Sequence, residues 1–156
     1  MTRKRKYENR KKNLTQYYNT FYQRLKRDYP KTIGNKPTII FHSYVLLLDE
    51  KAALELEGIG DKKEHSYLVD GIFEDKKNQI HIFGVARYDI GLLKQTIRHE
   101  TLHGFLFNTG KEWGDESTLF LLLAIKYNAK PYGFLINRRE ARDNADLQGR
   151  ADTQEP

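Results

Sequence analysis

The chain has 156 residues, a mass of 18.4 kDa and a formal net charge of +6, and it contains no cysteine. This length predicts one domain that is large enough to bury a hydrophobic core of its own. The lack of cysteine excludes disulfide frameworks, thiol nucleophiles and zinc sites with cysteine ligands. Any metal site must therefore use His, Asp and Glu side chains.

The distribution of apolar residues gives no sign of a membrane protein. No stretch has the length and apolarity of a transmembrane helix, and the basic N-terminus runs into polar residues instead of an apolar signal-peptide region. We therefore expect a cytoplasmic protein without a membrane partner.

The positive charge is concentrated at the N-terminus. Residues 1–12 contain seven Lys or Arg and one Glu, whereas the rest of the chain carries equal numbers of basic and acidic side chains. Such a run is typical of a disordered solubility tail, and the alternative is a weak contact with nucleic-acid phosphates. We divide the chain into a basic arm at 1–13, a folded domain at 14–136 and a polar, disordered tail at 137–156.

The first half of the folded domain shows one helical and one extended pattern. Apolar side chains recur at helical spacing up to Pro30, so we predict an amphipathic helix at residues 15–29. The β-branched and aromatic residues 38–41 favour a strand. Residues 45–56 fit either a buried strand or a short helix.

The second half of the domain predicts a hairpin followed by two helices. Apolar runs at residues 67–73 and 80–85 flank a polar turn and indicate a β-hairpin. A helix at 89–108 follows and ends near a glycine, and the strongly apolar segment 115–127 predicts a second, largely buried helix. The fold class is therefore α+β: a small zincin-like domain with an N-terminal helix and a short antiparallel or mixed sheet with an edge hairpin.

The most informative motif is His99-Glu100-Thr101-Leu102-His103, within the first of these two helices. Histidines at positions i and i+4 lie on one helix face, so both imidazoles can bind one zinc ion, Zn²⁺. Glu100 lies beside that face and can accept a proton from the attacking water. This is the HExxH pattern of zinc metallopeptidases, and the alternative is two surface histidines that flank a helical glutamate.

The third zinc ligand must be a carboxylate. No histidine follows His103, and the chain lacks the extended metzincin pattern. Asp115 and Glu116, at the predicted start of the next helix, are the two candidates. We prefer Glu116, because an aspartate after a glycine is also a natural helix N-cap.

A family resemblance is carried by the segment from Ile97 to Phe107 together with Asp115-Glu116 and the apolar helix that follows. This part of the chain resembles the small phage and mobile-element proteins of the ImmA/IrrE-like minigluzincin group, and the resemblance covers residues 70–127. It implies that an HExxH helix and a glutamate from a downstream helix hold the metal. It also implies a cytoplasmic peptidase that cleaves regulatory proteins such as repressors.

By position, the resemblance implies one role for each site residue. His99 and His103 would be zinc ligands, Glu100 the catalytic base and Glu116 the third ligand. A further donor must stabilise the oxyanion. Its candidates are Tyr88, Tyr127, Tyr132 and His81. We also expect residues 80–84 to form an exposed edge strand that pairs with an extended peptide substrate.

Two functions follow from these observations. The leading hypothesis is a zinc metallopeptidase of gluzincin type that hydrolyses a cytoplasmic protein, such as a regulator or repressor. The alternative is a non-catalytic zincin-fold protein that serves as an antirepressor or a nucleic-acid-associated adaptor. Glu100 distinguishes them, because a purely structural metal site does not need a carboxylate beside its open position.

Overall fold

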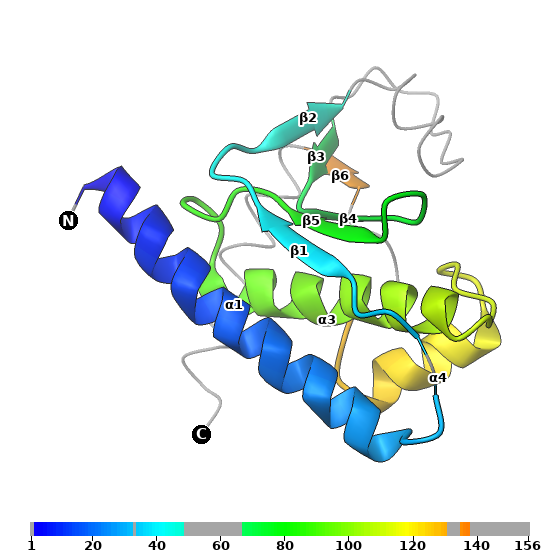
Figure 1. The fold of residues 1–156 in the computed structure, drawn as a ribbon. Helices are drawn as coiled ribbons and strands as arrows, with labels where there is room; N and C mark the ends of the chain where they lie inside the picture. The colour runs from blue at the N-terminus through cyan, green and yellow to red at the C-terminus, as the bar shows by residue number, and fades with distance from the viewer. Residues whose placement is uncertain (1, 33, 49–66, 131–134, 138–156) are drawn as a thin grey trace.

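The computed structural model describes residues 2–32, 34–48, 67–130 and 135–137 (Figure 1). Its helices and strands are α1 (Arg3–Asp28), β1 (Thr38–Phe41), β2 (Leu46–Leu48), β3 (Tyr67–Val69), β4 (Gly71–Glu74), β5 (Gln79–Ile82), α3 (Ile90–Asn108), α4 (Thr118–Lys126) and β6 (Leu135–Asn137). These elements confirm the α+β class. The predictions for residues 49–56, for Tyr132 and for the tail beyond residue 137 lie outside the described residues.

Helix α1 confirms the amphipathic pattern but begins twelve residues before the predicted start at Thr15. Its buried side chains are Leu14, Tyr18, Phe21, Tyr22 and Leu25. The Thr2 side chain caps the helix by accepting a hydrogen bond from the backbone N–H of Arg5 at 3.2 Å. The basic segment is therefore helical from Arg3, and the expectation of a disordered arm is wrong for this segment.

Two side chains of the basic segment explain why it is ordered. The Tyr7 hydroxyl donates a hydrogen bond to the carbonyl of Phe41 at 2.9 Å. The Arg10 guanidinium donates to the carbonyls of Val85 and Tyr88, at 3.1 and 2.6 Å. These contacts join the start of α1 to the end of β1 and to the loop before α3.

The first sheet has the strand order β1-β5-β4 and is mixed, which is one of the two predicted alternatives. Strand β1 pairs with β5 in parallel, and β4 pairs with β5 antiparallel in the predicted hairpin. The expectation that residues 80–84 form the exposed edge is wrong, because β1 occupies the other side of β5. Within the described part of the chain, β4 is the edge strand on the hairpin side.

The apolar run at residues 67–73 is divided between two sheets. Strand β3 belongs to a second sheet with the order β2-β3-β6, whereas β4 belongs to the first sheet. Only Asp70, which is buried, separates the two strands. Asn137, predicted to belong to the tail, is the last residue of β6 and pairs with Tyr67.

Helix α3 is the centre of the structure. It packs against β4 and β5 on one side and against α1 and α4 on the other (Figure 1). Its middle is buried from Ile97 to Leu106, apart from the half-buried Arg98. The histidine motif therefore lies between the sheet and the other helices.

Helix α4 differs from its prediction in two ways. It begins at Thr118, three residues later than expected, because Ser117 is the N-cap and accepts a hydrogen bond from the N–H of Phe120. Only one face is buried, with Phe120 and Leu123 in the core. The opposite side chains Leu119, Leu122 and Ile125 are exposed. None of the described helices is long and apolar enough to span a membrane.

Candidate metal centre

The end of α3 directs the chain back toward its own histidines. Helix α3 begins with Asp89 as its N-cap and ends in a Schellman motif around Gly110, whose φ is +73°. In this motif the N–H of Lys111 donates to the carbonyl of Leu106 at 2.9 Å, and the N–H of Gly110 donates to Phe107 at 3.1 Å. The turn lets residues 113–115 lie beside the helix.

Each histidine of the motif is anchored by a backbone carbonyl. His99 and His103 are 1% and 6% exposed, so their ring orientations depend on protein contacts. The Nδ1 atom of His99 donates to the carbonyl of Lys130 at 2.7 Å, and the Nδ1 atom of His103 donates to the carbonyl of Trp113. Because a carbonyl only accepts, both protons lie on Nδ1, and each neutral imidazole keeps its lone pair on Nε2.

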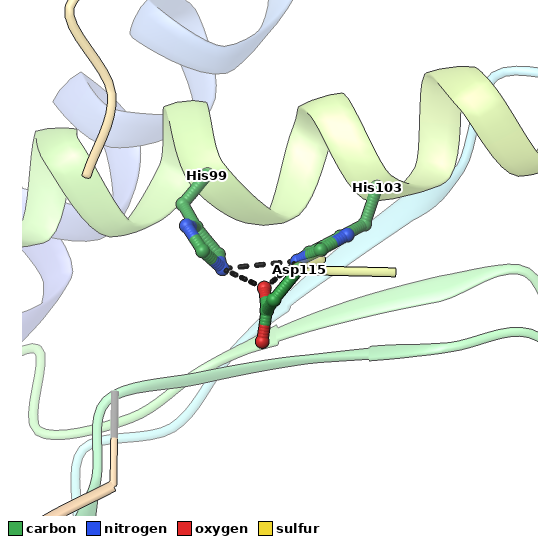
Figure 2. A group of neighbouring side chains, drawn as sticks. All are labelled: His99, His103 and Asp115. Carbon is green, nitrogen blue, oxygen red and sulfur yellow. Dashed lines mark hydrogen bonds and ion pairs between the residues drawn. The ribbon is translucent and has the colours of Figure 1, made fainter. Parts of the chain in front are cut away.

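Both Nε2 atoms face one oxygen of Asp115. The two Nε2 atoms are 3.0 Å apart, and Asp115 Oδ1 lies 2.7 Å from Nε2 of His103 and 3.1 Å from that of His99 (Figure 2). Two lone pairs and a carboxylate oxygen thus converge on one small volume, where they can bind a cation. The cluster could hold a metal ion.

The electrostatics of the cluster follow from these contacts. Burial alone would raise the pKa of Asp115, but hydrogen bonds with His103 and His99 outweigh it and hold that pKa well below its ordinary value. Burial alone would lower the pKa of His99, but the hydrogen bond to Asp115 outweighs it and the pKa is raised. The ionised Asp115 carboxylate therefore favours a proton on Nε2 of His99, in the position where a metal ion would replace it.

Glu116 does not join this group. It is exposed and lines a separate shallow pocket with Glu112, Trp113, Gly114 and Ser117. The preference for Glu116 over Asp115 assumes that Asp115 caps the next helix, but Ser117 does so. The structure places Asp115, the alternative candidate, against the histidines, in the loop before α4 and not on the helix itself.

Glu100 lines the same cavity as the metal cluster. The cavity has a volume of about 220 Å³ and is lined by Ile72, Phe73, His99, Glu100, His103, Trp113, Gly114 and Asp115. Burial raises the pKa of Glu100 above its ordinary value, although the two histidines oppose this effect. The raised pKa lies closer to neutral pH, and this suits a group that accepts and returns a proton.

Strand β4 forms the other side of the cavity because Gly71 lets it approach α3 closely. A Cβ atom at Gly71 would lie 2.5 Å from Cγ2 of Thr96 and 3.0 Å from Cγ of Glu100. No larger residue fits there unless the strand or the side chains of Thr96 and Glu100 move. Among the described strands β4 forms this edge of the sheet, and the backbone N–H of Phe73 donates a hydrogen bond to Glu100.

The predicted oxyanion donors are placed elsewhere. The Tyr127 hydroxyl donates to Asp28 at 2.6 Å, and His81 contacts Glu74 and His42. Neither these two residues nor Tyr88 lines the cavity. Trp113, which lines the cavity and anchors His103, was not predicted from the sequence. Its position two residues before Asp115 was the only available signal.

Asp70 is a buried carboxyl group close to the site. It is 3% exposed, and neither of its carboxylate oxygens has a hydrogen-bond partner among the described residues. Burial raises its pKa well above the ordinary value, opposed by Lys130 and reinforced by Glu100. The folded state therefore binds this proton more tightly than the unfolded state does.

We expect Asp70→Asn to stabilise the protein at pH 8 more than at pH 5. Because the folded pKa is raised, the stability contributed by Asp70 is present below its unfolded pKa and is lost as pH rises through the folded pKa. Each tenfold difference in proton affinity between the two states corresponds to about 1.4 kcal/mol, and asparagine does not titrate. Melting temperatures of both proteins at the two pH values test this. A variant that gains less stability at pH 8 than at pH 5 would contradict the raised pKa of Asp70.

The fold and the site together define a mixed α and β domain with a buried His-His-Asp cluster beside a buried glutamate. Comparison with protein-family models, with curated proteins and with solved structures found no match. A function must therefore be inferred from the site itself.

Proposed function

We propose that this protein is a zinc-dependent metallopeptidase with a zincin-like fold. His99, His103 and Asp115 would hold the zinc ion, and Glu100 would act as the general base. The observation that supports this most is the orientation of the histidines. Both Nδ1 atoms are bonded to carbonyls while both Nε2 atoms face Asp115, in a cavity that also contains Glu100.

The donor set fits zinc. Two imidazole nitrogens and one carboxylate oxygen are typical zinc ligands, whereas magnesium and calcium prefer oxygen ligands. Three protein ligands leave a fourth position for water or substrate, as in catalytic zinc sites. Asp115 would take the place that the resemblance to minigluzincins gives to a glutamate.

The reaction would depend on Glu100 and on the edge strand β4. When bound, zinc lowers the pKa of a coordinated water and polarises a carbonyl group. Glu100 would accept the proton of the attacking water and return it to the leaving amine. The edge of β4, which pairs with β5 alone among the described strands, would bind the backbone of an extended peptide, with Ile72 and Phe73 beside the scissile bond. We place the substrate among cytoplasmic proteins, such as regulators or repressors.

A non-catalytic role as an antirepressor or nucleic-acid-associated adaptor is the second candidate. The observation that favours it is the exposure of basic side chains on the first half of α1, which include Arg3, Lys4, Arg5, Lys11 and Lys12. Such a surface can neutralise nucleic-acid phosphates. Binding through this surface needs neither Glu100 nor the cavity. An assay of peptide hydrolysis therefore distinguishes the two candidate functions.

We expect the zinc-loaded full chain to cleave members of a peptide library, with the products identified by mass spectrometry. 1,10-Phenanthroline should abolish cleavage and added zinc should restore it, whereas magnesium should not, because the site offers too few oxygen ligands. Cleavage that persists in the chelator would exclude a metallopeptidase. No cleavage by zinc-loaded protein would favour the second candidate.

A further inference from the structure

A second cluster of metal-binding side chains lies on the opposite face of the first sheet. Gly71 faces α3 and pairs with Ile82, so the neighbouring pair of Ile72 and His81 lies on the other face. Glu74, two residues after Ile72, shares this outer face with His81. His42 directly follows β1 and contacts His81, so the cluster joins the end of β1 to strands β5 and β4.

The hydrogen bonds of this cluster orient His81 for metal binding. Its Nε2 atom lies 3.2 Å from Oε2 of Glu74, and its Nδ1 atom lies 3.0 Å from Nε2 of His42. An ionised carboxylate only accepts, so Glu74 fixes the proton of neutral His81 on Nε2. The lone pair on Nδ1 therefore faces His42. A carboxylate that orients an imidazole in this way is a regular feature of histidine metal sites.

The separation of the two nitrogens fits one cation. Ligands at adjacent positions, each about 2.0–2.1 Å from a metal ion, lie about 3 Å apart. The 3.0 Å between His42 and His81 equals the distance between the Nε2 atoms of His99 and His103.

Aromatic packing and partial exposure complete this arrangement. The His42 and His81 rings are parallel to within 10°, and Phe83 stacks on His42 with a centroid separation of 4.7 Å. The ring of Tyr44 contacts His42 from another side, at 5.1 Å between centroids. These contacts limit ring motion, while the side chain of His81 keeps 20% of its surface exposed, so a cation can arrive from solvent.

We propose that His42 and His81 form a second metal site for a late first-row divalent cation such as zinc, nickel or copper, with Glu74 as the positioning residue. Two imidazoles without a thiolate suit these ions. Before metal binding, the proton between the two rings belongs to Nε2 of His42. When the metal ion binds, it takes the place of this proton, which moves to Nδ1 of His42. The site shares no residue with the proposed catalytic centre and connects β1, β5 and β4.

Equilibrium dialysis of the full chain against zinc well above saturation of the catalytic centre, followed by elemental analysis, tests this proposal. We expect His42→Gln and His81→Gln each to bind one zinc equivalent fewer than wild type. Glu74→Gln should keep that equivalent with about 10–100-fold weaker affinity, because only the orientation of His81 is lost. Tyr44→Phe is the matched control and should bind as wild type does.

Thermal melting provides the second measurement. High zinc should raise the melting temperature of the wild type by several degrees more than that of His42→Gln, because a ligand that binds only the folded state stabilises it. Equal zinc content and equal shifts in wild type and both histidine variants would overturn the proposal and leave the cluster as a hydrogen-bond chain. The comparison does not depend on the proposed catalytic centre. If that centre binds no zinc, the histidine variants should still bind one zinc ion fewer than wild type.

Discussion

Replacing Glu100 by glutamine is expected to lower kcat for peptide cleavage by about 10²–10⁴-fold and to leave the zinc content unchanged. Glutamine keeps the size of the side chain in the cavity but cannot accept the proton of the attacking water. Glu100 is not among the three residues that converge on the metal position, so metal binding should survive. Cleavage of the best library peptide and elemental analysis of the same samples measure both effects.

The matched control for this variant is Glu112→Gln. Glu112 is an exposed glutamate outside the cavity that Glu100 lines, so its replacement should leave kcat unchanged. Equal activity of wild type and Glu100→Gln would contradict the catalytic role of Glu100. Loss of zinc in Glu100→Gln would instead show that this residue is a ligand or is needed for the shape of the site.

Asp115→Ala is expected to weaken zinc binding by more than about 100-fold, which is the upper end of what loss of a ligand's hydrogen-bond partner costs. The variant removes the only carboxylate in contact with His99 and His103 among the described residues, and two ligands hold zinc less tightly than three. Competition with a chromophoric chelator gives the affinity directly. Peptide cleavage should fall with the bound zinc.

Glu116→Ala is the control that the chain itself offers, because Glu116 is adjacent in sequence and exposed. We expect its zinc affinity to match that of wild type. The opposite result, with zinc lost from Glu116→Ala and retained by Asp115→Ala, would restore the ligand predicted from the sequence. Loss of zinc in both variants would show that the loop before α4 holds the metal through its conformation.

The histidine pair was predictable because its geometry is local. Positions i and i+4 of a helix lie on one face wherever the helix is placed, so the spacing of His99 and His103 already implied a shared ligand position. The helix itself was equally clear, with Asp89 as a natural N-cap and Gly110 at its end. Neither conclusion depended on how the chain folds at long range.

The third residue of the cluster was not predictable in the same way. Asp115 and Glu116 are adjacent carboxylates, and the choice depends on the path of the loop between α3 and α4. Two features that only the structure shows determine that path. The carbonyl of Trp113 accepts a hydrogen bond from His103, and Ser117 caps α4. Both Asp115 and Ser117 are good N-cap residues, so capping preference could not separate them.

The strand order also depended on contacts distant in sequence. The hairpin of β4 and β5 was predictable from its turn, but the parallel pairing of β1 with β5 brings Ile39 against Ile80, which no local pattern indicates. The division of residues 67–73 between two sheets has the same origin. The apolar run is continuous on both sides of Asp70, and only tertiary packing places the two strands in different sheets.

Because α1 includes the basic N-terminal residues, a truncation that removes their charge also removes contacts that hold the fold together. Removing residues 1–12 would delete Tyr7 and Arg10 together with the surrounding lysines, and with them the attachments to Phe41 and to the segment that leads into α3. A shortened protein would thus lose contacts that support helix α3, together with its positively charged surface. Lys4, Lys11 and Lys12 are exposed, and substitutions there change the charge while the scaffold stays in place.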